Sequence, residues 1–204
     1  MKNGLRSRMA ARLLGAGLAL LPAAALAHPG DHTLGHGDSF VSGFLHPIFG
    51  ADHLVVMLAI GLWAAYLGGR AVVGVPLAFI GMMIAGSVLS QAGVALPAVE
   101  QTIAASIVVF GLLICLLARL PAGPAALLVG LFASFHGFAH GAEMPDVATP
   151  FLYGAGFVMA TAMLLGLGGA IGFASRGNVP APFIRAVGAA VMAFGVVTVW
   201  ARIA

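Results

Sequence analysis

Long apolar segments separated by short polar breaks occupy most of the 204-residue chain. Each segment is long enough to cross a bilayer core of about 30 Å, which takes a helix of about 20 residues. Only helices and closed barrels satisfy the backbone in lipid, and continuously apolar runs of this length are typical of helices. The pattern predicts an all-α integral membrane domain over residues 43–204, with six transmembrane helices near 43–68, 71–92, 98–119, 124–142, 150–174 and 183–202.

The first 27 residues have the pattern of a targeting segment. A basic start with four Lys and Arg residues precedes an apolar run over residues 13–21, which is too short to span a bilayer. Ala25 and Ala27 fit the small-x-small rule for a cleavage site. We predict a signal peptide over residues 1–27, with an uncleaved signal anchor as the alternative. Residues 28–42 then form a histidine-containing periplasmic N-terminal segment.

The charged residues indicate both the surroundings of the chain and its orientation in the membrane. Only 7% of the residues are charged and 61% are hydrophobic, whereas soluble domains average about 25% charged residues, so lipid surrounds most of the chain. The formal net charge of +3 is thinly spread and does not indicate a nucleic-acid partner. With a periplasmic start, the cytoplasmic connections carry Arg70, Arg119, Arg176 and Arg185. The outer side carries Arg202, Asp31, Asp38, Glu100, Glu143 and Asp146.

This distribution follows the positive-inside rule. It predicts a multi-pass protein of the bacterial inner membrane with the mature N-terminus and the C-terminus both periplasmic. We interpret Glu100 and Asp146 as solvated loop charges, and the single cysteine, Cys115, as a buried structural thiol. The sequence carries no signal for an oligomeric state.

All seven histidines fall into three groups. The first is in the N-terminal segment, the second is at the start of the first predicted helix, and the third is at the end of the fourth. In order, the groups with their acidic neighbours are His28, His32 and His36; His46, Asp52 and His53; and His136, His140 and Glu143.

The second and third groups have helical spacing. His136, His140 and Glu143 stand at positions i, i+4 and i+7, so they share one helix face. On a continuous helix over 43–68, His53 shares a face with His46 and lies about 10 Å deeper. If the two antiparallel helices pack together, His46 is level with His140 and Glu143, and Asp52 and His53 meet His136. This arrangement is a two-step ladder that descends from the periplasm.

Ionisable residues inside membrane spans are costly and are functional candidates by default. Imidazole suits nickel, copper, zinc and iron, and carboxylates add charge compensation. With no thiolate pair available, Cu(I) and structural zinc are less attractive. Interhelical hydrogen bonding by the histidines is the structural alternative. For His28, His32 and His36, a metal-collecting site and a merely solvated tail are equally open interpretations.

These residues resemble the HupE/UreJ family of nickel or cobalt permeases, which are linked to hydrogenase and urease maturation. The resemblance covers the whole chain and rests on His46-Pro47 through Gly50 to Asp52-His53, and on Phe135-His136-Gly137 through His140-Gly141-Ala142-Glu143. It implies that His46, Asp52, His53, His136, His140 and Glu143 form a transport site for Ni²⁺ or Co²⁺. The metal is then cargo, no cofactor is implied, and the protein is expected to be a secondary permease and not an enzyme.

Three other functions are compatible with the residues. An intramembrane zinc hydrolase could use Glu143 or Asp52 as general base, and a b-type cytochrome could use one histidine from each helix as axial ligands. A metal-binding sensor or accessory protein is the third. A His/acid motif in the first helix of each three-helix half also suggests a 3+3 inverted repeat.

Overall fold

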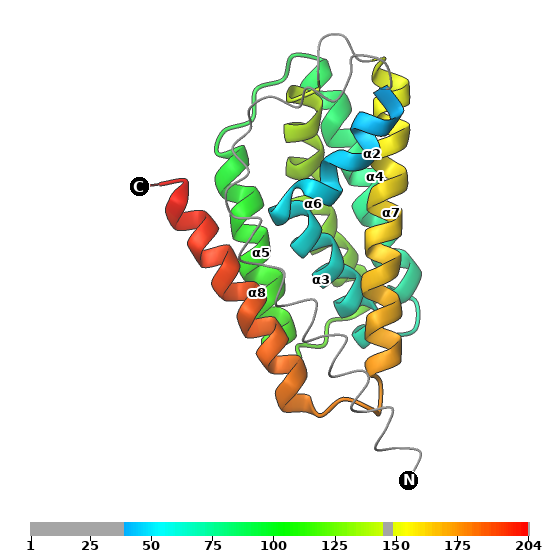
Figure 1. The fold of residues 1–204 in the computed structure, drawn as a ribbon, viewed down its shortest axis with the longest axis vertical. Helices are drawn as coiled ribbons and strands as arrows, with labels where there is room; N and C mark the ends of the chain where they lie inside the picture. The colour runs from blue at the N-terminus through cyan, green and yellow to red at the C-terminus, as the bar shows by residue number, and fades with distance from the viewer. Residues whose placement is uncertain (1–38, 145–148, 204) are drawn as a thin grey trace.

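The computed structural model describes residues 39–144 and 149–203, and within these ranges the regular structure is entirely helical (Figure 1). The predicted signal peptide lies outside the described residues, and so do His28, His32, His36 and Asp146. The all-helical class is confirmed, and most helix ends agree with the predicted ranges to within a few residues. The helices are α2 (Ser39–Phe49), α3 (Ala51–Leu67), α4 (Ala71–Gln91), α5 (Val99–Cys115), α6 (Ala122–Ala142), α7 (Pro150–Ser175) and α8 (Ala181–Ala201).

The first predicted helix is wrong in one respect, because it is not continuous. A helix already begins at Ser39, inside the predicted polar segment, and the chain bends by 75° between α2 and α3. Gly50 stands at the bend with extended backbone. Its N–H donates to the carbonyl of His46 and its carbonyl accepts from Leu54, so the break leaves both of its backbone groups paired. A β-carbon at Gly50 would lie 2.8 Å from Nδ1 of His53, so only glycine fits there without a shift.

Four helices are long and apolar enough to cross a membrane: α4, α6, α7 and α8. The bent pair α2–α3 is a fifth candidate if it counts as one span, and α5 is a shorter apolar helix of 17 residues. Large apolar side chains face outward on these helices; Leu127 is 77% exposed and Phe151 80% exposed. A surface of this kind is stable against lipid and not against water. The chain is therefore a multi-pass membrane protein.

Helix α3 occupies the centre of the bundle (Figure 1). The successive residues Val55, Val56 and Met57 are all buried, although successive positions on a helix point to different sides. A helix that is apolar all round is typical of a buried position. The C-terminal end of α3 is tied to the loop after α5, because Trp63 Nε1 donates to the carbonyl of Ala118 and Tyr66 donates to that of Leu117.

Glycines hold the other helices at short distances. α4 packs on α6, where a β-carbon at Gly86 would overlap the backbone of Ser134 and one at Gly137 would overlap that of Met83. α3 packs on α7 and α5 packs on α8 through similar glycines. This is the close packing of small residues that membrane helices favour. Cys115, interpreted as a buried thiol, is only partly buried at the α5–α8 contact.

Candidate metal site

The bend at Gly50 turns the end of α2 back over the start of α3. His46 stands in the last turn of α2 and His53 in the first turn of α3, and their ring centroids are 5.9 Å apart. The predicted depth difference of about 10 Å between these two histidines is therefore wrong, because it assumed one straight helix. The bend gathers the two imidazoles at one place.

The last two turns of α6 supply the other half of the cluster. The His140 ring lies 4.9 Å from that of His46 and 4.3 Å from that of His53, and the His136 ring lies 5.4 Å from that of His53. Glu143, which caps α6, has a carboxylate oxygen 3.8 Å from Nε2 of His46. The two motifs, which are far apart in the sequence, thus meet in one cluster of four imidazoles and a carboxylate.

Two sets of three residues have ligand atoms close enough to hold one ion, with all atoms within 4.8 Å of one another. We call His53, His136 and His140 the inner group; all three side chains are buried. We call His46, His140 and Glu143 the outer group; here the Glu143 side chain is half exposed. His140 belongs to both groups. The outer and inner groups resemble the two steps of the predicted ladder, but the His53 ring contacts that of His140 as well as that of His136.

Most of the buried ring nitrogens of the cluster have no hydrogen-bond partner among the described residues. This holds for Nε2 of His53, Nδ1 of His136 and both ring nitrogens of His140. Leaving a buried polar atom unpaired costs about 1–3 kcal/mol, and native proteins contain few such atoms. Several of them in one place indicate a site for a ligand that supplies the missing interaction, as a metal ion does for imidazole.

Asp52 stands behind His53 and belongs to neither group. Its Oδ1 lies 2.6 Å from Nδ1 of His53 and accepts the backbone N–H of the same residue at 2.9 Å. Its Oδ2 pairs with Arg202, at the end of α8, at 2.9 Å. A carboxylate that orients a histidine from behind is a recurrent device at metal sites.

Arg202 also pairs with Glu100 at the start of α5. Glu100 is half exposed, as expected of a solvated charge, but it is not a loop residue, because it stands in the first turn of α5 and pairs with Arg202. The ion pairs of Arg202 with Glu100 and Asp52 link α5, α8 and α3. They fix Oδ2 of Asp52, the carboxylate oxygen that does not contact His53. No local sequence pattern reveals these ion pairs, because the paired residues are far apart in sequence.

Sequence analysis missed three further residues that contact the cluster. Oγ of Ser106, on α5, lies 3.1 Å from Nε2 of His136. The hydroxyl oxygen of Tyr153, on α7, lies 3.2 Å from Nδ1 of His46. The ring of Phe157, also on α7, lies 4.1 Å from that of His140. A serine or an aromatic residue in an apolar helix is ordinary, so only the packing identifies them.

Of the three cluster residues from the α6 motif, Glu143 alone lies just beyond the end of the helix. Burial raises the pKa of its carboxyl above the ordinary value. The C-terminal end of α6, where helix carbonyls concentrate negative potential, also faces this place. The outer group therefore presents a carboxylate and a helix end that attract a cation.

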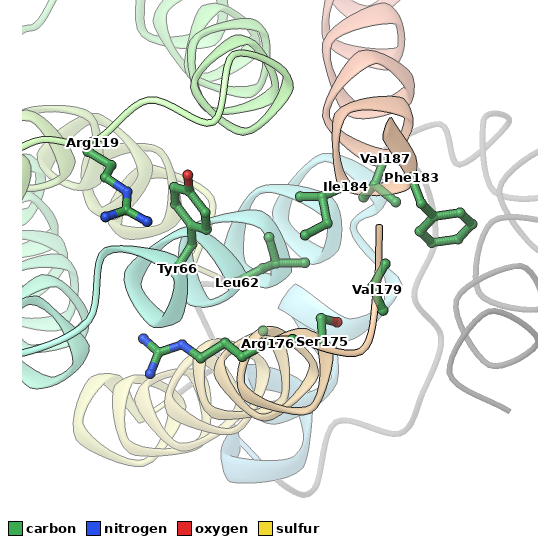
Figure 2. Close-up of a pocket in the computed structure, with 11 residues that line it drawn as sticks. Leu62, Tyr66, Arg119, Ser175, Arg176, Val179, Phe183, Ile184 and Val187 are labelled. Carbon is green, nitrogen blue, oxygen red and sulfur yellow. The ribbon is translucent and has the colours of Figure 1, made fainter. Parts of the chain in front are cut away.

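A separate pocket of about 370 Å³ lies near the opposite end of α3, between α3, α7 and α8 (Figure 2). Arg119 and Arg176 line it together with apolar side chains such as Leu62 and Ile184, and its lining includes no histidine or acidic residue. The guanidinium carbon of Arg119 lies 5.3 Å from the centre of the Tyr66 ring, and Arg176 donates to the carbonyl of Ala65. This pocket repels cations and does not belong to the histidine cluster.

Fold and cluster together define a multi-pass membrane protein with a buried polyhistidine site. The chain matches the HupE / UreJ protein family over residues 16–198, and it belongs to that family. It is similar to Protein HupE of Rhizobium leguminosarum bv. viciae, with 43% identity over 178 residues, which cover 86% of this chain and 90% of the relative. No solved structure matches the chain. The resemblance drawn from the two histidine motifs is thus confirmed at the level of the family.

Proposed function

We propose that the protein is a secondary permease that imports Ni²⁺, or Co²⁺, across the bacterial inner membrane. The observation that carries this proposal is the convergence of unpartnered imidazole nitrogens from α3 and α6 inside a membrane protein. Imidazole and carboxylate without thiolate suit a divalent ion of this kind. The family resemblance supports nickel or cobalt as cargo and the maturation of hydrogenase or urease as its destination.

Transport would proceed by exchange of ligands around His140. A hydrated ion first meets the outer group, where Glu143 is accessible and His46 and His140 replace some of its waters. The ion then passes to His53 and His136 while it stays bound to His140, which has a second unpartnered nitrogen. Because one ligand is retained, the ion is never without a protein ligand between the two groups.

The same proposal includes a topology of six spans, in which α2 and α3 form one bent span and α5 is the shortest. In this arrangement a signal peptide precedes the outer N-terminal segment, and Arg70, Arg119, Arg176 and Arg185 face the cytoplasm. Its support is the apolar length of the helices and the position of Arg119 and Arg176 near the end of α3 that lies opposite the histidine cluster. His28, His32 and His36 would then lie on the side from which the ion arrives.

A 3+3 inverted repeat is supported by the way in which the helices pair. If the half α3–α5 is exchanged with the half α6–α8, the α3–α7 pair maps onto the α6–α4 pair, and the α5–α8 pair maps onto itself. The histidine motifs do not follow this exchange, because one begins α3 and the other ends α6. We therefore assign the repeat to the arrangement of the helices and not to the histidine cluster.

The test is uptake of radiolabelled nickel at submicromolar metal in cells that lack other nickel importers. We compare the wild type with His53→Ala and His136→Ala at equal abundance. Ser175→Ala is the matched control, because Ser175 is a buried polar residue at the far end of α7. The proposal requires accumulation by the wild type and the control and at least a tenfold loss in both histidine variants.

One observation favours a second candidate, an intramembrane zinc hydrolase. The inner group consists of three histidines, a set that can hold catalytic zinc with one position left open for water. A wild type that accumulates neither nickel nor cobalt, together with one tightly bound zinc per purified chain, would replace the permease by this hydrolase.

A further inference from the structure

The environment of His136 contains a hydrogen-bond arrangement that the transport proposal does not use. Oγ of Ser106 lies 2.6 Å from the carbonyl oxygen of Ile103, one turn back on α5, and 3.1 Å from Nε2 of His136. Ser106 and His136 are both fully buried. Ser106 therefore connects α5 to the inner group at a place without access to water.

A serine hydroxyl has one proton to donate and two lone pairs that accept. The shorter contact, to Ile103, ends on a carbonyl oxygen that can only accept, so the hydroxyl proton is committed to it. The contact with His136 then requires the ring to donate, which places the ring proton on Nε2. The second nitrogen of a neutral imidazole is bare, and here it is Nδ1, the nitrogen without a partner.

We infer that Ser106 is a positioning residue that fixes His136 in the Nε2–H tautomer and so makes Nδ1 its metal-binding atom. This inference rests on the proposed function, because it names the atom by which the inner group receives the ion. Without the hydroxyl, neither ring nitrogen is fixed, and a ring with its proton on Nδ1 cannot bind the ion from that side. Ser106 plays for His136 the part that Asp52 plays for His53.

The direct test needs no substitution in Ser106. Full-length, metal-free protein labelled with ¹⁵N-histidine is placed in lipid nanodiscs at a pH at which imidazole is neutral, and the His136 signals are assigned by their disappearance in His136→Asn. We expect a protonated Nε2 and an unprotonated Nδ1, and addition of Co²⁺ should shift Nδ1 far more than Nε2. A proton on Nδ1, or direct ligation through Nε2, overturns the inference.

Variants test the same point through binding. Ser106→Ala should weaken Co²⁺ binding by about 10- to 100-fold, the usual effect of removing a group that orients a metal ligand, and Ser106→Thr, which keeps the hydroxyl, should restore it. Ser134→Ala is the matched control, because Ser134 makes the same bond to a carbonyl three residues back on α6 and is only partly buried. Wild-type affinity in Ser106→Ala overturns the inference and leaves the permease standing. Absence of Co²⁺ and Ni²⁺ binding by the wild type overturns both.

A second pair of variants reports which nitrogen matters. The amide of asparagine can place an oxygen near the position of Nδ1, and that of glutamine can place one near Nε2. We therefore expect His136→Asn to retain more Co²⁺ affinity than His136→Gln. The reverse order contradicts the tautomer that Ser106 is inferred to fix.

Discussion

At the scale of single residues, His140 has the most demanding position in the cluster, because it belongs to both the inner and the outer group. We expect His140→Ala to lower nickel uptake by at least about 100-fold, since both steps of the path lose a ligand. Glu143→Gln should mainly raise the KM for uptake, because it removes the carboxylate only from the outer group. Initial uptake rates over a range of nickel concentrations distinguish the two, and equal effects of both variants on KM would argue against a division into two groups.

The chemistry of the ligands also determines a pH dependence. Imidazole binds a metal only when neutral, and free imidazole gains its proton near pH 6.5. The raised pKa of Glu143 means that this carboxylate loses its charge at a higher pH than usual as the medium is acidified. Both effects have the same sign, so uptake should fall as the external medium is acidified. Uptake measured at a clamped membrane potential checks this, and uptake that rises steadily with acidity would contradict it.

At the scale of the helices, the contact between α4 and α6 sets the position of the α6 histidines. A β-carbon at Gly137 would overlap the carbonyl of Met83, so Gly137→Ala forces the helices apart. Overpacking of this kind typically costs about 1–3 kcal/mol, and we expect a lower midpoint of thermal unfolding together with weaker uptake. Gly123→Ala is the control on the same helix, since a β-carbon there meets open space. An unchanged midpoint in Gly137→Ala would show that the two helices are less closely packed than described.

The bend between α2 and α3 is a second element with a testable role. Gly50 has φ −74°, which alanine also adopts, so Gly50→Ala should leave the backbone unstrained. Its new methyl group would nevertheless press on Nδ1 of His53, 2.8 Å away. We expect weaker Co²⁺ binding by the purified protein with little change in thermal stability. A loss of stability with unchanged affinity would assign Gly50 to the fold and not to the site.

At the scale of the whole molecule, the sequence predicted the apolar helices that a bilayer requires. It did not predict the contacts that depend on how these helices pack against one another. A bilayer demands long apolar runs, so α4, α6, α7 and α8 could be placed closely. The spacing of His136, His140 and Glu143 on one face followed from helix geometry. The sequence does not distinguish Gly50, where the helix breaks, from Gly137 and Gly141, which lie inside the continuous helix α6. Ser106 and Arg202 were not predictable as partners of the cluster, because their contacts join residues 30 and 150 positions apart.

Orientation is the property of the whole molecule on which the direction of transport depends. We expect the connection between α4 and α5 to face the periplasm and that between α7 and α8 the cytoplasm. Single cysteines at two exposed positions, Val94→Cys and Asn178→Cys in a Cys115→Ser background, can report on this. A membrane-impermeant maleimide should label Val94→Cys in intact spheroplasts and Asn178→Cys only after lysis.

The opposite labelling pattern would place Glu143 and the outer group on the cytoplasmic side. An arriving periplasmic ion would then meet the arginine-lined end first, where Arg119 and Arg176 repel it. The same ligands would be reached from inside the cell, so the cluster would serve export or sensing and not import. The labelling experiment thus shows on which side of the membrane the outer group lies, and with it the direction that the proposed path requires. Uptake by a wild type with inverted labelling would require an entry path that avoids the outer group.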